Sequence, residues 1–281
     1  MRKKRVIILA GVILAALAAG ILDSRYHLTV TEYELGFGDL PPAFDGFRIV
    51  QLSDLHGMRF GKGNRRLADR VKELSPDIIV FTGDFAGSNA EIPATAELAE
   101  ALGSEVPVYA VSGNHEWCGD VTAYALYDIL SGCGVRCLAD EYETIEKEGS
   151  RIVIAGVNDS NCAYGHRPYD ALASELREEY PDEFVLWLGH RNDWIKKYPT
   201  LPVDLILSGH AHGGIVRLPL VGGLLNTNRS LGAEYESGVY ESGTYRMVVS
   251  RGLGNSIPVP RFLNRPEIVL ISLRAEPGNS K

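Results

Sequence analysis

The sequence predicts an α/β fold in which layers of sheet are flanked by helices. Short apolar runs rich in Val and Ile recur along the chain, and segments with the spacing of amphipathic helices separate them. The composition agrees, because 45% hydrophobic and 23% charged residues are typical of a globular protein and exclude a disordered or collagen-like chain. At 281 residues the chain is long enough to bury a large core.

The N-terminal segment predicts a single-pass anchor in the cell membrane. Positions 6–22 carry no charged side chain and directly follow a basic cluster, Arg2 to Arg5. As a helix this run would span ~26 Å, which lies within the usable range for a transmembrane helix. The basic cluster favours a cytoplasmic N-terminus, so we expect the folded part to be extracytoplasmic.

Three alternatives stay open for this segment. Ala16-Leu17-Ala18 resembles a signal-peptidase site, and cleavage there would remove the anchor. The helix could also lie in the interface of the inner leaflet, or pack on the folded part. We expect residues 1–24 to form the anchor and residues 25–281 to form one domain, since no repeat or long linker interrupts residues 25–275.

The apolar runs behind the anchor predict strands buried on both faces. They are residues 47–52, 78–82, 106–111, 152–157, 184–188 and 204–208, and two later runs, 244–250 and 267–273, are expected to complete the sheets. Helical spacing, in several cases after a capping residue, predicts helices over 64–74, 94–102, 120–130 and 170–179.

The charge balance argues against a surface that coats nucleic acid. The formal net charge is −8. Four of the basic residues precede the apolar segment, so the rest of the chain is more acidic still and would repel the phosphates of nucleic acid. The sequence leaves the oligomeric state open.

The chain has four cysteines, Cys118, Cys133, Cys137 and Cys162. Their spacing fits neither a CxxC redox motif nor a zinc knuckle. We expect small buried hydrophobic side chains, and one disulfide remains an alternative.

Five of the seven histidines lie in turns that follow predicted strands. These turns read Ser53-Asp54-Leu55-His56, Gly83-Asp84, Gly113-Asn114-His115-Glu116, Gly189-His190 and Gly209-His210-Ala211-His212. Ligands of open α/β sheets bind outside the carboxyl ends of the strands, so we expect these turns to converge in space.

The side chains in these turns form a donor set of carboxylates, one amide and imidazoles, with no thiolate. Nitrogen and oxygen donors of this kind suit Mn, Fe, Zn, Co or Ni. Seven candidate ligands are too many for one tetrahedral ion, and they suit two ions that share a carboxylate, as in two-metal hydrolytic sites.

In their order over residues 48–214, these five turns resemble the signature blocks of the calcineurin-like metallophosphoesterases. The later segments from His210 to Pro219, Ser250 to Gly254 and Arg261 to Glu267 resemble a membrane-associated, phosphodiesterase-like bacterial branch of that family. The resemblance implies a four-layer fold with two mixed β-sheets between helices. It also implies two divalent metal ions as cofactors, with Mn, Fe or Zn as candidates.

The resemblance further implies a role for each candidate residue. Asp54, His56 and His212 would hold one metal, Asn114, His190 and His210 would hold the other, and Asp84 would bridge them. His115 would be catalytic, facing the scissile phosphate to stabilise charge or protonate the leaving oxygen.

One departure from the family pattern follows His190. The family often has a proline two residues after this histidine, whereas this chain reads His190-Arg191-Asn192-Asp193. Arg191 could contact substrate or be solvated. The same choice stays open for basic or polar residues near the turns, namely Arg59, Lys62, Asn64, Arg251, Glu116 and Trp117.

We therefore expect a membrane-tethered phosphoesterase that hydrolyses a phosphodiester or pyrophosphate bond by attack of a metal-bridging hydroxide. The expected partner is a small phosphate compound or a lipid, and membrane placement favours a lipid-linked or cell-envelope substrate. Three alternatives remain: a phosphomonoesterase or nucleotide phosphatase, a metal-dependent amide or ester hydrolase, and a non-catalytic scaffold.

Overall fold

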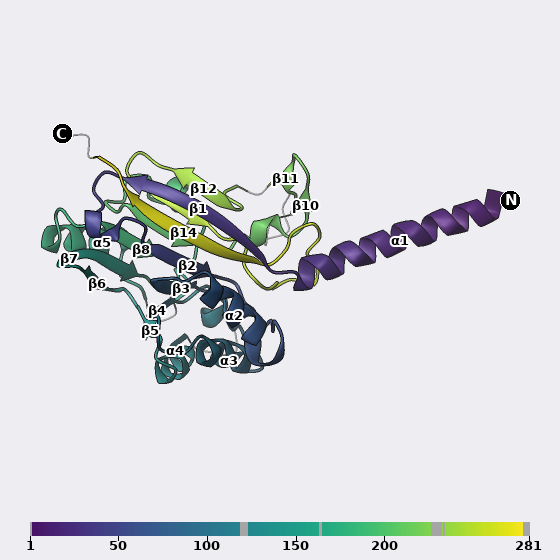
Figure 1. Ribbon diagram of the computed structural model, residues 1–281, viewed down its shortest axis with the longest axis horizontal. Coiled ribbons are helices and arrows are strands. Elements are labelled where there is room, and N and C mark those ends of the chain that lie inside the picture. The colour runs from purple at the N-terminus through teal and green to yellow at the C-terminus, as the bar shows by residue number, and fades with distance from the viewer. Residues whose placement is uncertain (1, 119–122, 163–164, 226–231, 233, 278–281) are drawn as a thin grey trace.

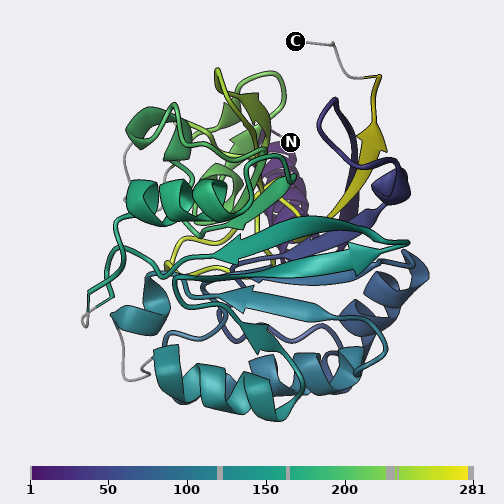
Figure 2. The same ribbon diagram turned by 90° about the vertical axis from the view of Figure 1, so that its left-hand side faces the viewer.

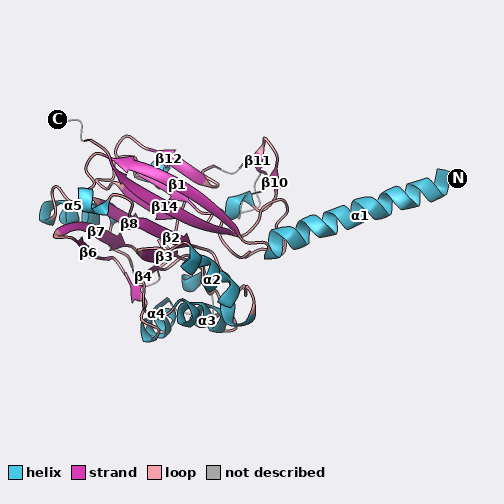
Figure 3. Cartoon of the chain, viewed as in Figure 1, coloured by secondary structure: helices cyan, strands magenta, loops and turns pink. Residues whose placement is uncertain are grey.

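The computed structural model describes residues 2–118, 123–162, 165–225, 232 and 234–277. Two six-stranded sheets lie face to face, and helices cover their outer faces (Figure 2). Figure 3 distinguishes the helices in cyan from the strands in magenta and shows the helices outside the paired sheets. The chain therefore forms four layers.

The first sheet joins early strands to the last one. Its order is β1 (Thr29–Phe37), β14 (Glu267–Ala275), β2 (Arg48–Leu52), β3 (Ile78–Thr82), β4 (Val108–Val111) and β5 (Arg136–Cys137). Strands β2 to β5 are parallel, whereas β14 runs antiparallel to β2. Every residue of β3 is buried, because helices cover one face of the sheet and the second sheet covers the other.

The second sheet is also mixed. Its order is β12 (Gly238–Glu241), β13 (Arg246–Val249), β9 (Leu205–Ser208), β8 (Val185–Leu188), β7 (Ser150–Gly156) and β6 (Glu141–Lys147). The four central strands are parallel, and both edge strands are antiparallel to their neighbours. A separate small hairpin pairs β10 (Arg217–Leu218) with β11 (Gly222–Gly223).

Hydrophobic side chains fill the three spaces between the layers. Leu67 of α2 (Arg65–Glu73) packs with Phe81 under the first sheet, where α3 (Ile92–Leu102) and α4 (Ala123–Gly132) also lie. Ile49 and Leu186 belong to the core between the sheets. Trp187 lies in the core that the second sheet forms with α5 (Tyr169–Glu179) and α6 (Trp194–Lys197). The prediction of two mixed sheets between helices is confirmed.

The eight predicted strands and four predicted helices are all present, although residues 120–122 of one predicted helix lie outside the described residues. The sequence did not predict β1, β5, β6 and β12, which are the edge strands of the two sheets, nor the hairpin strands β10 and β11. The β6 sequence, EYETIEK, has charged side chains at four of its seven positions and no continuous apolar run. Charged side chains on edge strands prevent a sheet from pairing with other chains. Because of the same charges, such strands lack the hydrophobic pattern from which a strand is predicted.

Helix α1 (Arg2–Tyr26) extends away from the two sheets (Figure 1). Its length and composition would allow it to cross a membrane. Most of its side chains are exposed, so the alternative that this segment packs along the folded part is wrong. Contact is confined to its end, where Ser24 is buried and the Phe262 ring lies against Gly20.

None of the four cysteines forms a disulfide within the described part of the chain. Cys162 is buried as expected, but Cys118 is exposed, so the expectation of four buried side chains is wrong for that residue.

Candidate metal centre

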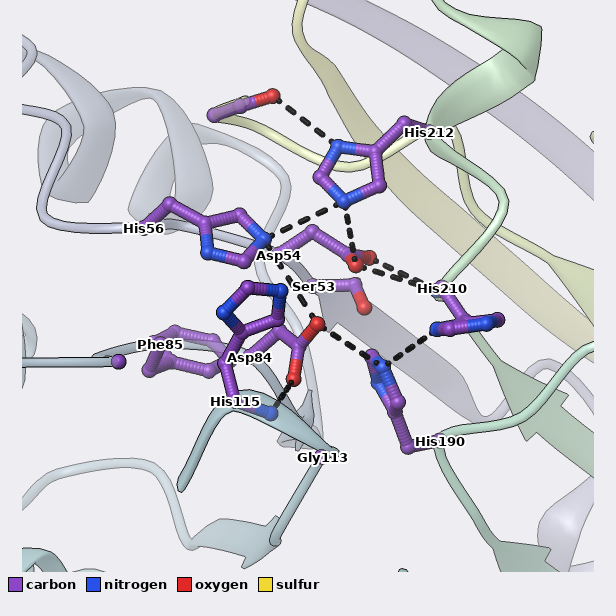
Figure 4. A network of polar contacts seen from close by, with 12 residues as sticks. Ser53, Asp54, His56, Asp84, Phe85, Gly113, His115, His190, His210 and His212 are labelled. Carbon is purple, nitrogen blue, oxygen red and sulfur yellow. Dashed lines mark hydrogen bonds and ion pairs between the residues drawn. The ribbon is translucent and has the colours of Figure 1, made fainter. Parts of the chain in front are cut away.

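The five predicted turns converge at the carboxyl ends of strands from both sheets (Figure 4). Backbone hydrogen bonds join neighbouring turns, as where the Asp54 N–H donates to the Gly83 carbonyl oxygen at 2.9 Å. The two sheets are also joined beside the site, because Gln51 Nε2 of β2 donates to the Ser208 carbonyl oxygen of β9 at 2.7 Å. The convergence expected from the sequence is thus present.

Asp54, His56, Asp84 and His212 form a first cluster, with one donor atom from each within 4.8 Å of all the others. The Nε2 atoms of His56 and His212 are 3.2 Å apart, and His212 Nε2 lies 3.3 Å from Asp54 Oδ1. His212 Nδ1 donates to the Gly254 carbonyl oxygen at 3.4 Å. This bond places the imidazole proton on Nδ1 and leaves Nε2 able to bind a cation.

Asp84, His190 and His210 form a second cluster. His190 Nε2 lies 3.1 Å from Asp84 Oδ2 and 3.3 Å from His210 Nδ1. His190 Nδ1 donates to the Thr82 carbonyl oxygen at 2.8 Å, which orients the ring towards Asp84. Asp84 is therefore common to both clusters.

The Asn114 side chain adds an oxygen donor without a partner. Its Oδ1 atom is buried and accepts no hydrogen bond within the described part of the chain. A buried acceptor left unsatisfied costs about 1–3 kcal/mol. Asn114 lines a cavity of about 310 Å³ together with Asp84 and His210. A cation at the second cluster would satisfy this oxygen, so the residues present fit a metal site.

Burial keeps three of the imidazoles neutral. It lowers the pKa of His56 to about 4, although the nearby Asp84 carboxylate opposes this effect. It lowers the pKa of His210 to about 3, together with the positive charge of His190. The pKa of His212 lies well below its usual value for the same reason. Neutral imidazoles are the form that binds metals.

His190 and Asp84 are the charged pair of the site. Burial disfavours a charged His190, but the Asp84 carboxylate overcomes this effect and raises the pKa of His190 to about 10. Burial likewise disfavours a charged Asp84, yet His190 holds the pKa of that carboxyl well below its usual value. Cation binding at this cluster would displace the His190 proton, as metal binding to histidine generally does.

The backbone of the site is strained at most of the predicted ligands. The φ angle is positive at five of them, with 53° at Asp54, 45° at His56, 57° at Asp84, 69° at His210 and 49° at His212. This left-handed conformation costs energy in residues other than glycine and occurs most often at functional sites. The surrounding hydrogen bonds and packing must therefore hold these five residues in place.

Two glycines let the turns approach one another closely. A Cβ atom at Gly113 would meet the carboxylate of Asp84, and one at Gly209 would meet Ser53 and Asp54. A larger residue at either glycine would displace a predicted ligand.

His115 lies beside the two clusters rather than in them. Its ring centroid is 4.7 Å from that of His56, and it lines the same cavity as Asp84 and Asn114. Its backbone N–H donates to Asp84 Oδ1 at 2.8 Å. The predicted catalytic residue thus adjoins the predicted ligands without belonging to either donor cluster.

Glu116 is a structural residue of the site whose role the sequence analysis left open. Its buried carboxylate accepts four backbone N–H bonds, from Asp84 at 3.0 Å, Phe85 at 2.6 Å, Ala86 at 3.1 Å and Gly113 at 2.8 Å. One side chain thereby fastens the turn of Asp84 to the turn of Asn114. Burial and the Asp84 charge raise the pKa of Glu116 to about 7.

Asn264 connects His212 to the end of α1. Its Nδ2 donates to the His212 carbonyl oxygen at 2.7 Å, and its backbone N–H donates to Ser24 Oγ at 3.2 Å. Arg261 supports the same ligand from another side, because its Nη1 donates at 2.7 Å to the Gly254 oxygen that His212 Nδ1 also contacts. The sequence analysis singled out this segment only by resemblance.

Arg191, which marks the departure from the family pattern, forms a bidentate ion pair with Asp159 at 2.6 and 2.9 Å. Its Nη1 also lies 3.2 Å from His210 Nε2. Arg191 is therefore fixed at the edge of the cavity rather than free in solvent. Three other open candidates have structural partners: Arg59 pairs with Glu97, Arg251 pairs with Glu267, and Asn64 bonds the backbone of Phe60 and Ala94.

Comparison with known families supports the resemblance. The model of the calcineurin-like phosphoesterase family matches residues 47–214, a segment that contains the five turns. The uncharacterized metallophosphoesterase YkuE of Bacillus subtilis is 32% identical, and the alignment covers 92% of this chain and 94% of YkuE.

Two further relatives have names that state an activity or a membrane location. Phosphodiesterase YaeI of Escherichia coli is 26% identical over 81% of this chain and 82% of its own length. A transmembrane protein with metallophosphoesterase domain from Danio rerio is 28% identical over 95% of this chain and 62% of its own length.

The shared carboxylate predicts that Asp84→Asn lowers metal content at both clusters. We expect the full chain in detergent, loaded with Mn and washed, to hold far less metal than the parent when measured by plasma mass spectrometry. The control is Asp140→Asn, which changes a buried carboxylate outside both clusters. Parent-like metal content in Asp84→Asn would contradict the shared role.

The four bonds to Glu116 predict that Glu116→Gln destabilises the protein. An amide has one acceptor oxygen in place of two, so buried N–H donors lose their partners and the free energy of unfolding should fall by about 2–4 kcal/mol. Urea unfolding in detergent measures this change. The control is Glu97→Gln, at a partly exposed carboxylate that pairs with Arg59, with an expected loss below about 1 kcal/mol. Equal losses in the two variants would remove Glu116 as the fastening residue.

Proposed function

Because this chain belongs to the calcineurin-like phosphoesterase family and is a phosphoric ester hydrolase, we propose that it cleaves a phosphodiester or pyrophosphate bond at a centre of two divalent ions. The observation that carries this proposal is the Asp84 carboxylate, which belongs to both donor clusters. Residues 25–281 form the catalytic domain in this proposal, behind an anchor within residues 1–24.

The predicted ligands divide between the clusters in a simple way. Asp54, His56 and His212 would hold one ion, and Asn114, His190 and His210 would hold the other, with Asp84 between them. Their nitrogen and oxygen donors suit Mn, Fe or Zn. Such ions would supply Lewis-acid chemistry there, by activating water as the nucleophile for attack on phosphorus.

His115 would assist departure of the alcohol. Its ring lies in the cavity beside Asp84, and the bond from its backbone N–H to Asp84 Oδ1 fixes its position relative to both clusters. A histidine outside the donor clusters can hold a proton and deliver it to the leaving oxygen.

A second cavity supports an amphiphilic substrate. This cavity of about 420 Å³ adjoins His56 and is lined by apolar side chains, including Met58 and Ile257, and by the cations Arg25 and Arg261. Arg25 belongs to the end of α1, so the cavity lies between the first cluster and the predicted membrane anchor. A lipid-linked or cell-envelope phosphate compound has both the anionic and the apolar groups that such a lining would bind.

Two further considerations support this assignment. YaeI carries the name phosphodiesterase, which favours a diester over a monoester. The retained donor clusters and the unpartnered Asn114 oxygen disfavour a scaffold without metal. We place the catalytic domain on the outer side of the cell membrane, because the basic cluster lies at the N-terminal end of α1.

The decisive experiment is hydrolysis by the full chain in detergent, stripped of metal and reloaded with Mn, Fe or Zn. We expect metal-dependent turnover of an aryl phosphodiester or a pyrophosphate diester to exceed that of the matching aryl phosphomonoester. Asp140→Asn should retain the parent rates, whereas Asp84→Asn should not. A preference for the monoester would favour the phosphatase alternative, and failure of the chain to bind metal would favour the scaffold.

The position of His115 predicts a selective defect in His115→Ala. Metal content should stay at the parent value, while kcat falls by about 10²- to 10⁴-fold for substrates with alkyl alcohol leaving groups. The loss should be smaller for a p-nitrophenolate leaving group, which needs no proton. The ratio of parent to variant kcat across a leaving-group series measures this difference. A uniform loss across the series would show that His115 is not a general acid.

A further inference from the structure

We propose that the β10–β11 hairpin is a second membrane-contacting element, whose apolar tip enters the lipid surface beside α1. The proposal rests on α1 as the membrane anchor, and it adds a contact that the anchor does not require. The hairpin tip reads Leu218-Pro219-Leu220-Val221. Leu220 is 108% exposed, Val221 is 65% exposed and Leu218 is 40% exposed.

These side chains are unusual for the folded part of the chain. Among the described residues outside α1, the other large apolar side chains with comparable exposure are Tyr124, Ile129 and Leu263. Four consecutive positions without a polar side chain are costly to expose to water, and an exposed apolar patch commonly marks a surface that binds a partner or a membrane.

The hairpin lies at the end of the body from which α1 departs (Figure 1). A short series of contacts connects the two elements. The Arg217 N–H donates to the Phe262 carbonyl oxygen at 3.0 Å, and the Phe262 N–H donates to the Ile215 carbonyl oxygen at 3.3 Å. The Phe262 ring in turn packs against Gly20 of α1, where a Cβ atom would come within 2.6 Å of it. The hairpin is thus held in a fixed relation to the helix.

Within the part of the chain that the structure describes, the side-chain polar contacts of the hairpin lie at its base. Arg217 pairs with Glu236 at 3.0 Å and donates to the Gly213 carbonyl oxygen at 2.8 Å. Glu236 also accepts the Gly223 N–H at 2.6 Å. At the tip, the Val221 N–H bonds the Leu218 carbonyl oxygen at 3.2 Å, which closes the turn. A braced polar base with an apolar tip is suited to insertion into a membrane interface.

The charges around the end of α1 favour a lipid surface over a protein partner. His27 and Leu28, which follow α1, line a cavity whose four basic side chains outnumber its two acidic ones: Lys62, Arg65, Arg66 and Arg70 against Asp69 and Glu73. The chain as a whole has a formal charge of −8, so this group of cations runs against the general charge. Clusters of Lys and Arg next to a membrane helix bind anionic headgroups. The apolar tip and this group of cations therefore both lie near the end of α1.

The test places tryptophan at the hairpin tip in the full chain. Leu220→Trp and the control Ile129→Trp, which substitutes an exposed residue of α4, are reconstituted into vesicles of phosphatidylcholine and phosphatidylglycerol with brominated or ordinary acyl chains. Bromine quenches tryptophan on contact. We expect brominated lipid to remove at least half of the emission that Leu220→Trp adds to the parent, and almost none of that added by Ile129→Trp.

Two outcomes would overturn the proposal in different ways. If the chain stays in the vesicles after alkaline extraction but Leu220→Trp is quenched no more than Ile129→Trp, α1 is an anchor and the hairpin does not enter lipid. If the chain is extracted by alkali, the anchor and the hairpin contact both fail. Neither result depends on catalysis, because phosphodiester hydrolysis in detergent is measured separately.

Discussion

The Asp84 carboxylate is the point on which the arrangement of the site depends. Its Oδ1 atom accepts the His115 N–H, and its Oδ2 atom faces His190 from the second sheet and His56 from the first. These contacts require both sheets to end at the same place. They also require Glu116 to hold the Asp84 turn. The Glu116 carboxylate does so by accepting the backbone N–H groups of both Asp84 and Gly113. The four layers therefore serve to fix one carboxylate among groups distant in sequence.

The convergence of these side chains could be predicted because Asp, Asn and His stand directly after apolar runs, where the carboxyl ends of parallel strands meet. The role of Glu116 could not be predicted in the same way, because its partners are backbone N–H groups and no side-chain pattern marks them. Asn264 reaches a carbonyl oxygen 52 positions away, a contact that exists only in the folded chain. Charged edge strands such as β6 were missed because hydrophobic periodicity detects buried strands.

The predicted anchor is joined to the catalytic part by structure rather than by a flexible tether. Only two residues, His27 and Leu28, separate the end of α1 from the start of β1. Ser24 bonds Asn264, and Asn264 bonds the backbone of His212. A helix attached in this manner gives the metal centre a defined height and direction relative to a membrane that contains it.

The left-handed backbone at five predicted ligands also limits how the centre can change during evolution. Residues with a branched Cβ are strongly disfavoured at such positions, whereas Gly, Asn, Asp and His are the residues best tolerated there. Of these tolerated residues, three carry oxygen or nitrogen donors and the fourth carries none. Substitution at these positions thus tends either to exchange one such donor for another or to abolish the ligand. The backbone conformation therefore limits which donor atoms can stand at these positions. Because donor type governs metal preference, it also limits the metals that descendants of this protein could bind.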